Sequence, residues 1–405
     1  MAEWDGTDLA RLATGSGDRD AAARLRAHAD DWDRAQRLPD GLIRALGRAG
    51  LLAADLPARH GGQGLTPAAL GALCARLGGV CTALRSAVTV QGMVAAALSR
   101  WGTDEQRARL LPALVRGERL AAFAATEDGA GTELGAVAAT LRRDGGDLVL
   151  DGAKKWVSFG ESADVFLVLA RLDGKPATVV VEAGGPGVSV EPVRGQLGLR
   201  AAHVAHVRFD AVRVPARDQV APAGFGLSHV VGTALDHGRF TIAWGCVGMA
   251  GACLELAARH TAAREQDGVR LSDHQAVRAA LGRALAAVAA ARAVCLGAAV
   301  SRQDGTPAAL TDTVVAKYTA ARTAAEVSQD AVQLLGAGGC APGSTVGRFF
   351  RDARIMQIIE GAELAAEVRM GDLALREHAP REHAPREHAG ARPAVARTAA
   401  VGTPR

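Results

Sequence analysis

Aromatic side chains make up only 3% of this chain of 405 residues, and Tyr318 is its one tyrosine. The net charge is also small for the length, at +4, and basic residues nowhere form a block interleaved with aromatic rings. Because such blocks mark proteins that bind nucleic acids, this class is not expected. A Walker glycine-lysine motif is also lacking, which excludes the phosphate-binding loop of that type. The composition, 49% hydrophobic and 22% charged, is that of an ordinary soluble globular protein.

Cysteine pairs of the CxxC type are missing, so the sequence predicts neither a zinc knuckle nor a redox dithiol. Two pairs lie seven residues apart, which places both members on one helical face, and we expect buried free thiols. The first residues lack a charged-then-apolar signal pattern, and charged residues interrupt the apolar runs before they reach the length of a membrane span. We therefore predict a cytoplasmic protein. The six cysteines are Cys74, Cys81, Cys246, Cys253, Cys295 and Cys340.

The hydrophobic pattern changes twice along the chain, which predicts three domains. Residues 1–118 and 219–375 show helical periodicity, and Thr66 and Pro67 form an N-cap and first position typical of a helix start. Residues 119–218 carry short β-type runs separated by glycine-rich turns. Since long helices do not separate these runs, an antiparallel sheet or small barrel is favoured over βαβ units. The predicted fold class is α+β, with an N-terminal helical domain, a middle antiparallel β domain and a C-terminal four-helix bundle.

The individual elements follow from the same pattern. Four long helices fit the last helical domain, and a four-helix bundle is their natural packing. Residues 376–390 are three near-copies of Arg-Glu-His-Ala-Pro, and proline at every fifth place prevents a continuous helix. We therefore predict a disordered tail over 376–405, in which the histidines are solvated and form no metal site. The predicted strands are 148–150, 165–169, 178–181 and 188–190, with two more between His203 and Val214.

One carboxylate, Glu360, interrupts an apolar run just before Gly361, and residues 351–354 ahead of the run carry two arginines and an aspartate. Burial among Ile and Met favours the neutral carboxyl and raises its pKa. A carboxyl with a raised pKa can act as a general base near neutral pH. The alternative is a carboxylate at the start of a helix over 363–375, half in water and stabilised by the helix dipole.

Two segments of the middle domain could bind a flat, anionic ligand. The glycines between Thr126 and Thr132 allow close approach of the backbone to an anion, and the threonine hydroxyls can donate to it. This segment is not a Rossmann fingerprint, because a strand–glycine–helix unit does not surround it. The Trp156 face beside the Ser158 hydroxyl could stack on a flat ring and donate a hydrogen bond to it. The alternative is a core tryptophan beside a surface serine.

Two histidine-containing segments are candidates for hydrolase and metal-binding chemistry, and the sequence favours neither. Residues 236–239 read Asp-His-Gly-Arg, but a serine nucleophile in a glycine elbow is lacking, so a hydrolase is rejected. His203 and His206 in a strand would point to opposite faces, which suits a metal poorly. Ordinary surface charge is the alternative for both segments.

Taken together, these segments resemble the acyl-CoA dehydrogenase superfamily across about residues 20–375, in both order and spacing. Residues 122–133 resemble its first flavin signature and residues 151–158 its second. Residues 330–336 and 351–361 resemble its C-terminal signatures. The tail from residue 376 has no counterpart.

This resemblance implies an FAD enzyme without a Rossmann fold. The segment from Phe123 to Thr132 would line the flavin and pyrophosphate, Trp156 would pack on the isoalloxazine, and Ser158 would lie near N5. A second set of residues, from the C-terminal domain, would hold the FAD of a neighbouring subunit. A complete FAD site would therefore need a homo-oligomer, either a dimer or a tetramer. The implied cofactor-binding residues are Phe123, Ala125, Thr126, Gly131, Thr132, Trp156 and Ser158, and, from the neighbouring subunit, Arg264, His274, Gln275, Gln333, Leu334, Gly336 and Ala337.

The resemblance also implies roles at the substrate. Glu360 would remove the α-proton of an acyl thioester while flavin N5 takes the β-hydride, and Asp236 and Arg239 fall at substrate-side positions. Donors on the thioester carbonyl, the backbone N–H of Glu360 among them, would stabilise the enolate. Asp267 and Ala362 depart from the family, which often has an aromatic residue and a threonine at these places.

A narrower resemblance is to the acyl-carrier-protein dehydrogenases of methoxymalonyl-type polyketide extender-unit pathways. It rests on residues 84–86, 91–93, 242–248 and 358–361. It implies a short hydroxylated C3 unit on an acidic carrier protein, oxidised toward a hydroxymalonyl thioester, and the slightly basic chain is compatible with such a partner. Three alternatives stay open: an ordinary α,β-desaturating acyl-CoA dehydrogenase, a flavin oxidase or monooxygenase on the same fold, and a non-catalytic helical scaffold.

Overall fold

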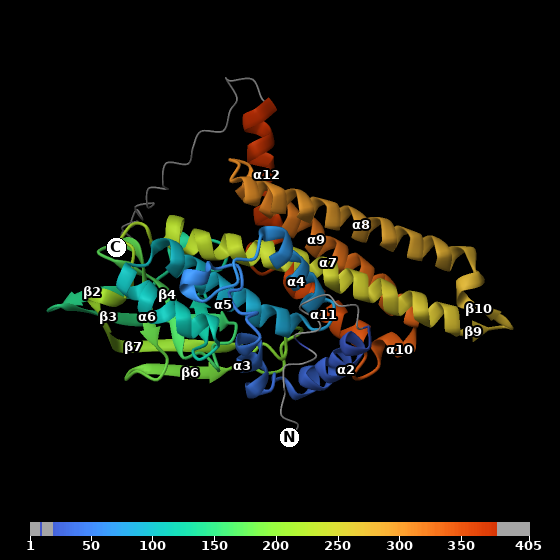
Figure 1. The fold of residues 1–405 in the computed structure, drawn as a ribbon, viewed down its shortest axis with the longest axis horizontal. Helices are drawn as coiled ribbons and strands as arrows, with labels where there is room; N and C mark the ends of the chain where they lie inside the picture. Colours follow the sequence, from blue (N-terminus) through green and yellow to red (C-terminus); the bar gives the residue numbers. More distant parts are fainter. Residues whose placement is uncertain (1–8, 10–18, 379–405) are drawn as a thin grey trace, which may run out of the picture.

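The computed structural model describes residue 9 and residues 19–378, and its long helices extend from one side of a β-sheet (Figure 1). The N-terminal part is helical, as predicted. Thr66 caps one helix by accepting the N–H of Ala69 at 3.3 Å, with Pro67 at the first position. Thr103 and Gln106 form a reciprocal capping box at another. These helices are α2 (Arg19–Ala35), α3 (Asp40–Arg48), α4 (Pro67–Gly78), α5 (Thr82–Trp101) and α6 (Asp104–Val115).

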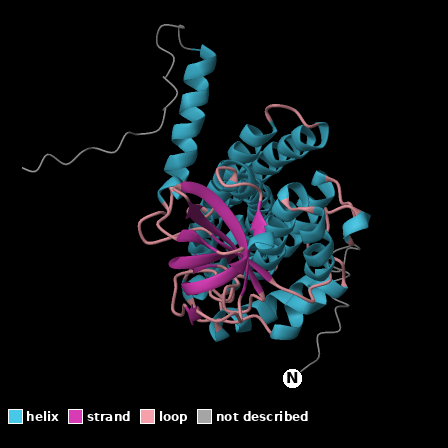
Figure 2. Ribbon diagram, turned by 90° about the vertical axis from the view of Figure 1, so that its left-hand side faces the viewer, coloured by secondary structure: helices cyan, strands magenta, loops and turns pink. Residues whose placement is uncertain are grey.

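The middle part forms an eight-stranded sheet that lies beside the helices and encloses a hydrophobic core of its own (Figure 2). The strand order is β6-β7-β3-β2-β4-β5-β8, with β1 beside β4. The sheet is mostly antiparallel, as predicted, but β4 pairs in parallel with both β1 and β2. The strands are β1 (Ala121–Ala124), β2 (Thr140–Asp144), β3 (Asp147–Val157), β4 (Val165–Leu172), β5 (Lys175–Glu182), β6 (Val188–Pro192), β7 (Ala205–Pro215) and β8 (Gln219–Val220).

Two details of the predicted sheet are wrong: the number of strands after His203, and the position of His203 within a strand. The two strands expected between His203 and Val214 are one strand, β7, whose pairing with β3 shifts register between Phe209 and Val212. Ala211, inside this bulge, has a φ of 47°, so the alternation of side chains breaks there without ending the strand. His203 precedes β7 and is buried, with its ring bonded to Ser162 Oγ and to a backbone carbonyl, each at 3.0 Å.

The C-terminal part contains three long helices, and the shorter α11 contacts two of them, α7 and α9, to complete the bundle. The sequence predicted four long helices, so the fourth is shorter than expected. The predicted tail also begins too early, because α12 continues to His378; residues 379–405 lie outside the described residues. The elements are α7 (Gly232–Ala263), a hairpin of β9 (Glu265–Gln266) and β10 (Val269–Arg270), α8 (Gln275–Asp304), α9 (Ala309–Leu335), α10 (Ala337–Cys340), α11 (Thr345–Met356) and α12 (Glu363–His378).

Glycines bring the N-terminal helices close to the bundle. A Cβ added at Gly248 of α7 would lie 1.8 Å from the carbonyl oxygen of Ala75 in α4. A Cβ at Gly78 of α4 would lie 2.3 Å from the carbonyl oxygen of Gly245. Any larger residue would therefore push α4 and α7 apart. The two helices share the main hydrophobic core of the protein.

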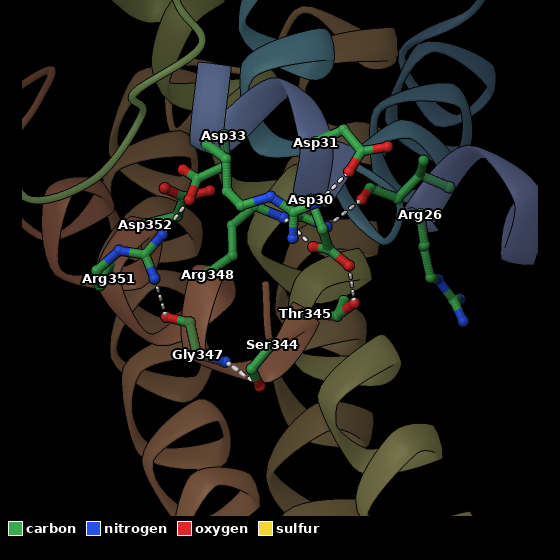
Figure 3. A network of polar contacts seen from close by, with 12 residues as sticks. Arg26, Asp30, Asp31, Asp33, Ser344, Thr345, Gly347, Arg348, Arg351 and Asp352 are labelled. Carbon is green, nitrogen blue, oxygen red and sulfur yellow. Dashed lines mark hydrogen bonds and ion pairs between the residues drawn. The ribbon is translucent and has the colours of Figure 1, made fainter. Parts of the chain in front are cut away.

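Arg351, which precedes the apolar run, and Arg348, one turn earlier in α11, have a structural role. Arg351 pairs with Asp33 of α2, and Arg348 pairs with Asp30 at 2.8 Å (Figure 3). Asp352 accepts a backbone N–H from the loop between β6 and β7 at 2.7 Å. These contacts join α11 to both other parts of the chain, so they fix the position of the turn that follows α11.

Two sequence-based expectations need correction: that charged residues keep every apolar run shorter than a membrane span, and that all the cysteines are buried. Within the described chain, the helical segments Gly226–Ala263 and Gln275–Asp304 are long and apolar enough to cross a membrane, because their charged residues leave an apolar window. That window is 72% buried in the first segment, which is a core helix, and 33% buried in the second.

Five cysteines are buried free thiols, but Cys340 is exposed. Cys81 follows the end of α4, so it does not share a helical face with Cys74.

Candidate active site

Glu360 lies in a tight turn between α11 and α12 rather than at the first residue of α12. Its φ is 55° and that of Gly361 is 104°, so two successive residues adopt left-handed conformations. Arg239 Nε donates to the carbonyl oxygen of Glu360 at 2.8 Å, and Lys317 Nζ donates to that of Gly361 at 2.9 Å. Lys317 is almost fully buried. Two cations from α7 and α9 therefore hold this turn by its backbone.

The carboxyl group of Glu360 packs against α7 where that helix has no side chain. A Cβ added at Gly238 would lie 3.2 Å from Glu360 Cδ and 3.0 Å from Met93 Sδ. Glu360 Oε2 is shielded from solvent and has no hydrogen-bond partner among the described residues. Burial raises the pKa of Glu360 to about 7, although Arg239, Lys317 and Arg85 act to lower it. The predicted direction of the shift is confirmed, and the group is poised to accept a proton near neutral pH.

The raised pKa of Glu360 predicts a pH profile. If Glu360 is the general base that the resemblance implies, it must be ionised to act, so kcat/KM should rise with pH through about 7 and level off above it. Below that point each pH unit should cost about tenfold in rate. The rate of anaerobic flavin reduction at low substrate concentration, between about pH 5.5 and 9, would measure it. A half-maximal rate near the ordinary glutamate value would show that the carboxyl is not desolvated in solution.

The predicted substrate-side residues, Asp236 and Arg239, lie in α7 on either side of Gly238, which faces the Glu360 carboxyl. Asp236 pairs with Arg302 of α8 at 2.5 Å, and this arginine also lies over the Phe240 ring. His237 is buried, 3.6 Å from Asp55, and burial lowers its pKa, so the ring is neutral. The structure thus brings Arg239 to Glu360 directly, whereas Asp236 is engaged in an ion pair.

The two predicted flavin segments meet through one buried lysine. Lys154 Nζ donates to the carbonyl oxygen of Ala125 at 3.0 Å and to Glu127 Oε1 at 2.6 Å. The backbone N–H of Lys155 donates to the carbonyl oxygen of Thr126 at 2.9 Å. The loop after β1 is therefore tied to the end of β3, immediately before Trp156.

Trp156 is 58% exposed, which excludes the alternative of a core tryptophan. Its φ of 57° turns the end of β3, and its ring meets His206 edge-on with centroids 5.3 Å apart. A Cβ added at Gly129 or Gly131 would meet no atom within 4 Å, so the adjoining loop is open. A free aromatic face beside an open glycine loop fits a flavin with its pyrophosphate.

The remaining predicted FAD residues lie far from Trp156 in the same chain. Arg264, His274 and Gln275 flank the β9–β10 hairpin, and Gln333 to Ala337 flank the start of α10. In Figure 1 the hairpin and α10 lie toward the end of the bundle away from the sheet. One chain does not bring the two sets together, as expected if they belong to different FAD sites.

The sequence-based site missed Lys317 and gave no role to Arg85 or Lys154, and all three are buried cations. Lys317 follows Val-Val-Ala within a helix, and a lone lysine in an apolar stretch was the available signal. Within the described residues, clusters of three or more His, Cys, Asp or Glu side chains that could hold a metal ion are absent.

Known proteins resemble most of the chain. Models of the C-terminal, N-terminal and middle domains of acyl-CoA dehydrogenases match residues 225–376, 18–118 and 122–212. A probable acyl-CoA dehydrogenase, fadE25 of Mycobacterium leprae (strain TN), is 30% identical over 390 residues, covering 93% of this chain and 100% of that protein. The chain belongs to the acyl-CoA dehydrogenase family. It is an FAD-dependent oxidoreductase that acts on acyl thioesters, and the scaffold alternative is excluded.

Two solved structures are similar to this chain over most of its length. FkbI, described as serving biosynthesis of the methoxymalonyl extender unit of the FK520 polyketide, is 38% identical with a TM-score of 0.81. The match covers 91% of this chain and 99% of FkbI. Butyryl-CoA dehydrogenase from Megasphaera elsdenii is 26% identical with a TM-score of 0.85, covering 92% and 98% of the two chains. The higher identity is to the protein that serves extender-unit biosynthesis.

Proposed function

We propose that this enzyme oxidises a short, hydroxylated C3 acyl unit held on an acyl carrier protein, toward a hydroxymalonyl or methoxymalonyl-type extender unit. The observation that carries this proposal is the 38% identity to FkbI over nearly its whole length, against 26% for butyryl-CoA dehydrogenase. The shared fold alone is equally compatible with an ordinary α,β-desaturating dehydrogenase, which is the second candidate.

In the proposed reaction Glu360 is the general base. Its carboxyl is desolvated yet surrounded by three cations, so it can be neutral or charged near pH 7. It would take an O–H proton from the hydrate of a C3 aldehyde, or an α-proton in the desaturating alternative. The backbone N–H of Glu360 donates to no acceptor within the described chain, so it is free for the thioester carbonyl. FAD supplies the two-electron acceptor when bound.

We propose that Trp156, Ser158 and the segment from Phe123 to Thr132 hold the FAD of their own chain, and that Arg239 holds the base. Asp236 would orient Arg302 at the substrate side of α7. The buried lysine between the flavin segments supports this assignment, because it fixes the loop beside the exposed indole.

We further propose a homo-oligomer in which Arg264, His274, Gln275 and the Gln333 to Ala337 turn complete the FAD site of another subunit. Both segments are largely exposed in the single chain. The apolar side chains Leu285, Leu296 and Val300 of α8 are also exposed, as expected of a helix that packs on another copy. The buried free thiols support a reducing compartment, the cytoplasm.

The decisive experiment compares one hydroxylated C3 acyl group on a carrier protein and on CoA. Anaerobic flavin bleaching should be at least about tenfold faster with the carrier-bound group, since carrier contacts add binding energy. Equal rates on the two carriers would contradict the narrower assignment. Rapid reoxidation in air with stoichiometric peroxide would instead identify a flavin oxidase, and an enoyl product would identify a desaturating enzyme.

A further inference from the structure

His206 of β7 faces Trp156 across a bulge in the sheet. The pairing of β3 with β7 shifts register between Lys154 and Val157. Lys155 and Trp156 therefore stand opposite the single residue His206. A bulge of this kind re-aims a side chain, and such bulges are common beside active sites. Lys154 and Val157 are both buried, so the bulge lets the exposed indole of Trp156 project away from the core of the sheet.

The two bulged residues donate their backbone N–H groups to partners outside the β-ladder. The N–H of Lys155 goes to the carbonyl oxygen of Thr126 at 2.9 Å. The N–H of Trp156 goes to Nδ1 of the His206 ring at 3.3 Å. A neutral imidazole that accepts at Nδ1 carries its own proton on Nε2. The side chain of His206 thus takes the place of a strand carbonyl as the acceptor for Trp156.

The conformation of Trp156 depends on contacts of this kind. Its φ of 57° is a left-handed conformation, which costs energy in a residue other than glycine and persists only where the surroundings fix it. His206 provides two such contacts, the Nδ1 acceptor and a ring perpendicular to the indole with centroids 5.3 Å apart. Perpendicular rings at this separation are a favoured aromatic arrangement. One side chain therefore fixes both the backbone and the ring of Trp156.

The structure separates His206 from His203, the other histidine of the same segment. His203 is buried before β7, with its ring bonded to Ser162 Oγ. His206 alternates with the buried Val207, so it points away from the core of the sheet, and it lines a cavity of about 250 Å³. Ser189 of β6 lines the same cavity but is not the strand partner of His206. The two histidines therefore have different surroundings, and only His206 contacts the predicted flavin segments.

We propose that His206 is a positioning residue that holds Trp156 so that the indole meets the isoalloxazine in one fixed orientation. This inference rests on the proposed function, in which Trp156 packs on the FAD of its own chain. The Nδ1 acceptor holds the left-handed backbone, and the imidazole ring prevents the indole from rotating toward β7. His206 acts through Trp156 and has no contact of its own with the reacting atoms in this role.

The test follows FAD loss from the diluted holoenzyme by the fluorescence of the released flavin. His206→Leu should lose FAD about tenfold faster than wild type, which is the combined effect of one hydrogen bond and one aromatic contact. His206→Asn should stay within about threefold of wild type, because its amide oxygen replaces the Nδ1 acceptor. Ser189→Ala, in the same cavity, should lose FAD at the wild-type rate. If His206→Leu does not fold, His206→Phe against His206→Asn tests the acceptor in its place.

A double variant shows whether His206 acts through Trp156. In the Trp156→Ala background, His206→Leu should change the rate of FAD loss by less than about twofold, because the residue that it positions is gone. The visible circular dichroism of the bound flavin, which reports the orientation of a neighbouring ring, should change in His206→Leu and return in His206→Asn.

Three outcomes would overturn the proposal, and they differ in what else they overturn. Effects of Trp156→Ala and His206→Leu that simply multiply would show that His206 has a general structural role. Wild-type FAD loss in His206→Leu, with faster loss in Trp156→Ala, would refute this inference and leave the proposed function standing. Wild-type FAD loss in Trp156→Ala would refute both this inference and the stacking assignment on which it rests.

Discussion

Glu360→Gln is expected to slow flavin reduction by substrate by about 10²-fold or more, which is the effect of removing a general base. Glutamine has nearly the same shape, so the packing on Gly238 and the backbone bonds from Arg239 and Lys317 should remain. The amide is neutral at every pH and cannot accept the proton. FAD content should stay at the wild-type level, because Glu360 lies in the α11–α12 turn and not in the flavin segments. Stopped-flow absorbance of the flavin under anaerobic conditions measures the rate.

Glu363→Gln is a matched control for this change. Glu363 begins α12, three residues after Glu360, and its Oε1 accepts a hydrogen bond from Gln357 at 2.9 Å. That bond can be replaced by an amide oxygen, so the rate should stay within about threefold of wild type. If Glu360→Gln reduced the flavin at the wild-type rate, another group would have to be the base. A loss of FAD in the same variant would instead point to a misfolded turn.

The sequence predicted the fold well where one local signal decided each element. The helix start at Thr66 and Pro67 is one example, because the cap and the fixed proline φ both act within one turn. It failed at β7, where a bulge at Ala211 reversed the alternation of side chains inside one strand. A bulge is stabilised by pairing with β3, some 60 residues away, and a local pattern does not contain that partner.

The candidate site was predicted in part for the same reason. The apolar run around Glu360 is local, so the direction of its pKa shift followed from sequence. The cations that hold the Glu360 turn could not be predicted from sequence, because Arg239 and Lys317 come from helices more than 40 residues away. The partner of buried Arg85 could not be foreseen either. Its Nη2 donates to Met356 Sδ, and Met356 lies 271 residues away from it in the sequence. Tertiary contacts, and not residue type, decide whether a buried cation is compensated.

Lys154→Met is the other substitution expected to have a large effect, because it leaves a carboxylate buried without its partner. The side chain of Lys154 is fully buried and that of Glu127 is 9% exposed. Removing one member of a buried pair typically lowers the free energy of unfolding by about 3 kcal/mol. The loop after β1 would also lose its bond to the carbonyl oxygen of Ala125, which holds it beside Trp156. We therefore expect both a lower unfolding midpoint and weakened FAD retention after gel filtration.

Lys155→Met provides the comparison at the neighbouring position. Lys155 lies 3.6 Å from Asp128, whose side chain is 82% exposed, so its loss should cost less than about 1 kcal/mol. The double variant Lys154→Met with Glu127→Gln should recover part of the lost stability, because it no longer buries an unpaired charge. It should not recover FAD, since the loop still lacks the bond from Lys154 to the carbonyl oxygen of Ala125. Thermal unfolding together with the ratio of flavin to protein absorbance separates the two effects. Wild-type flavin content in Lys154→Met would show that the loop holds FAD without this lysine.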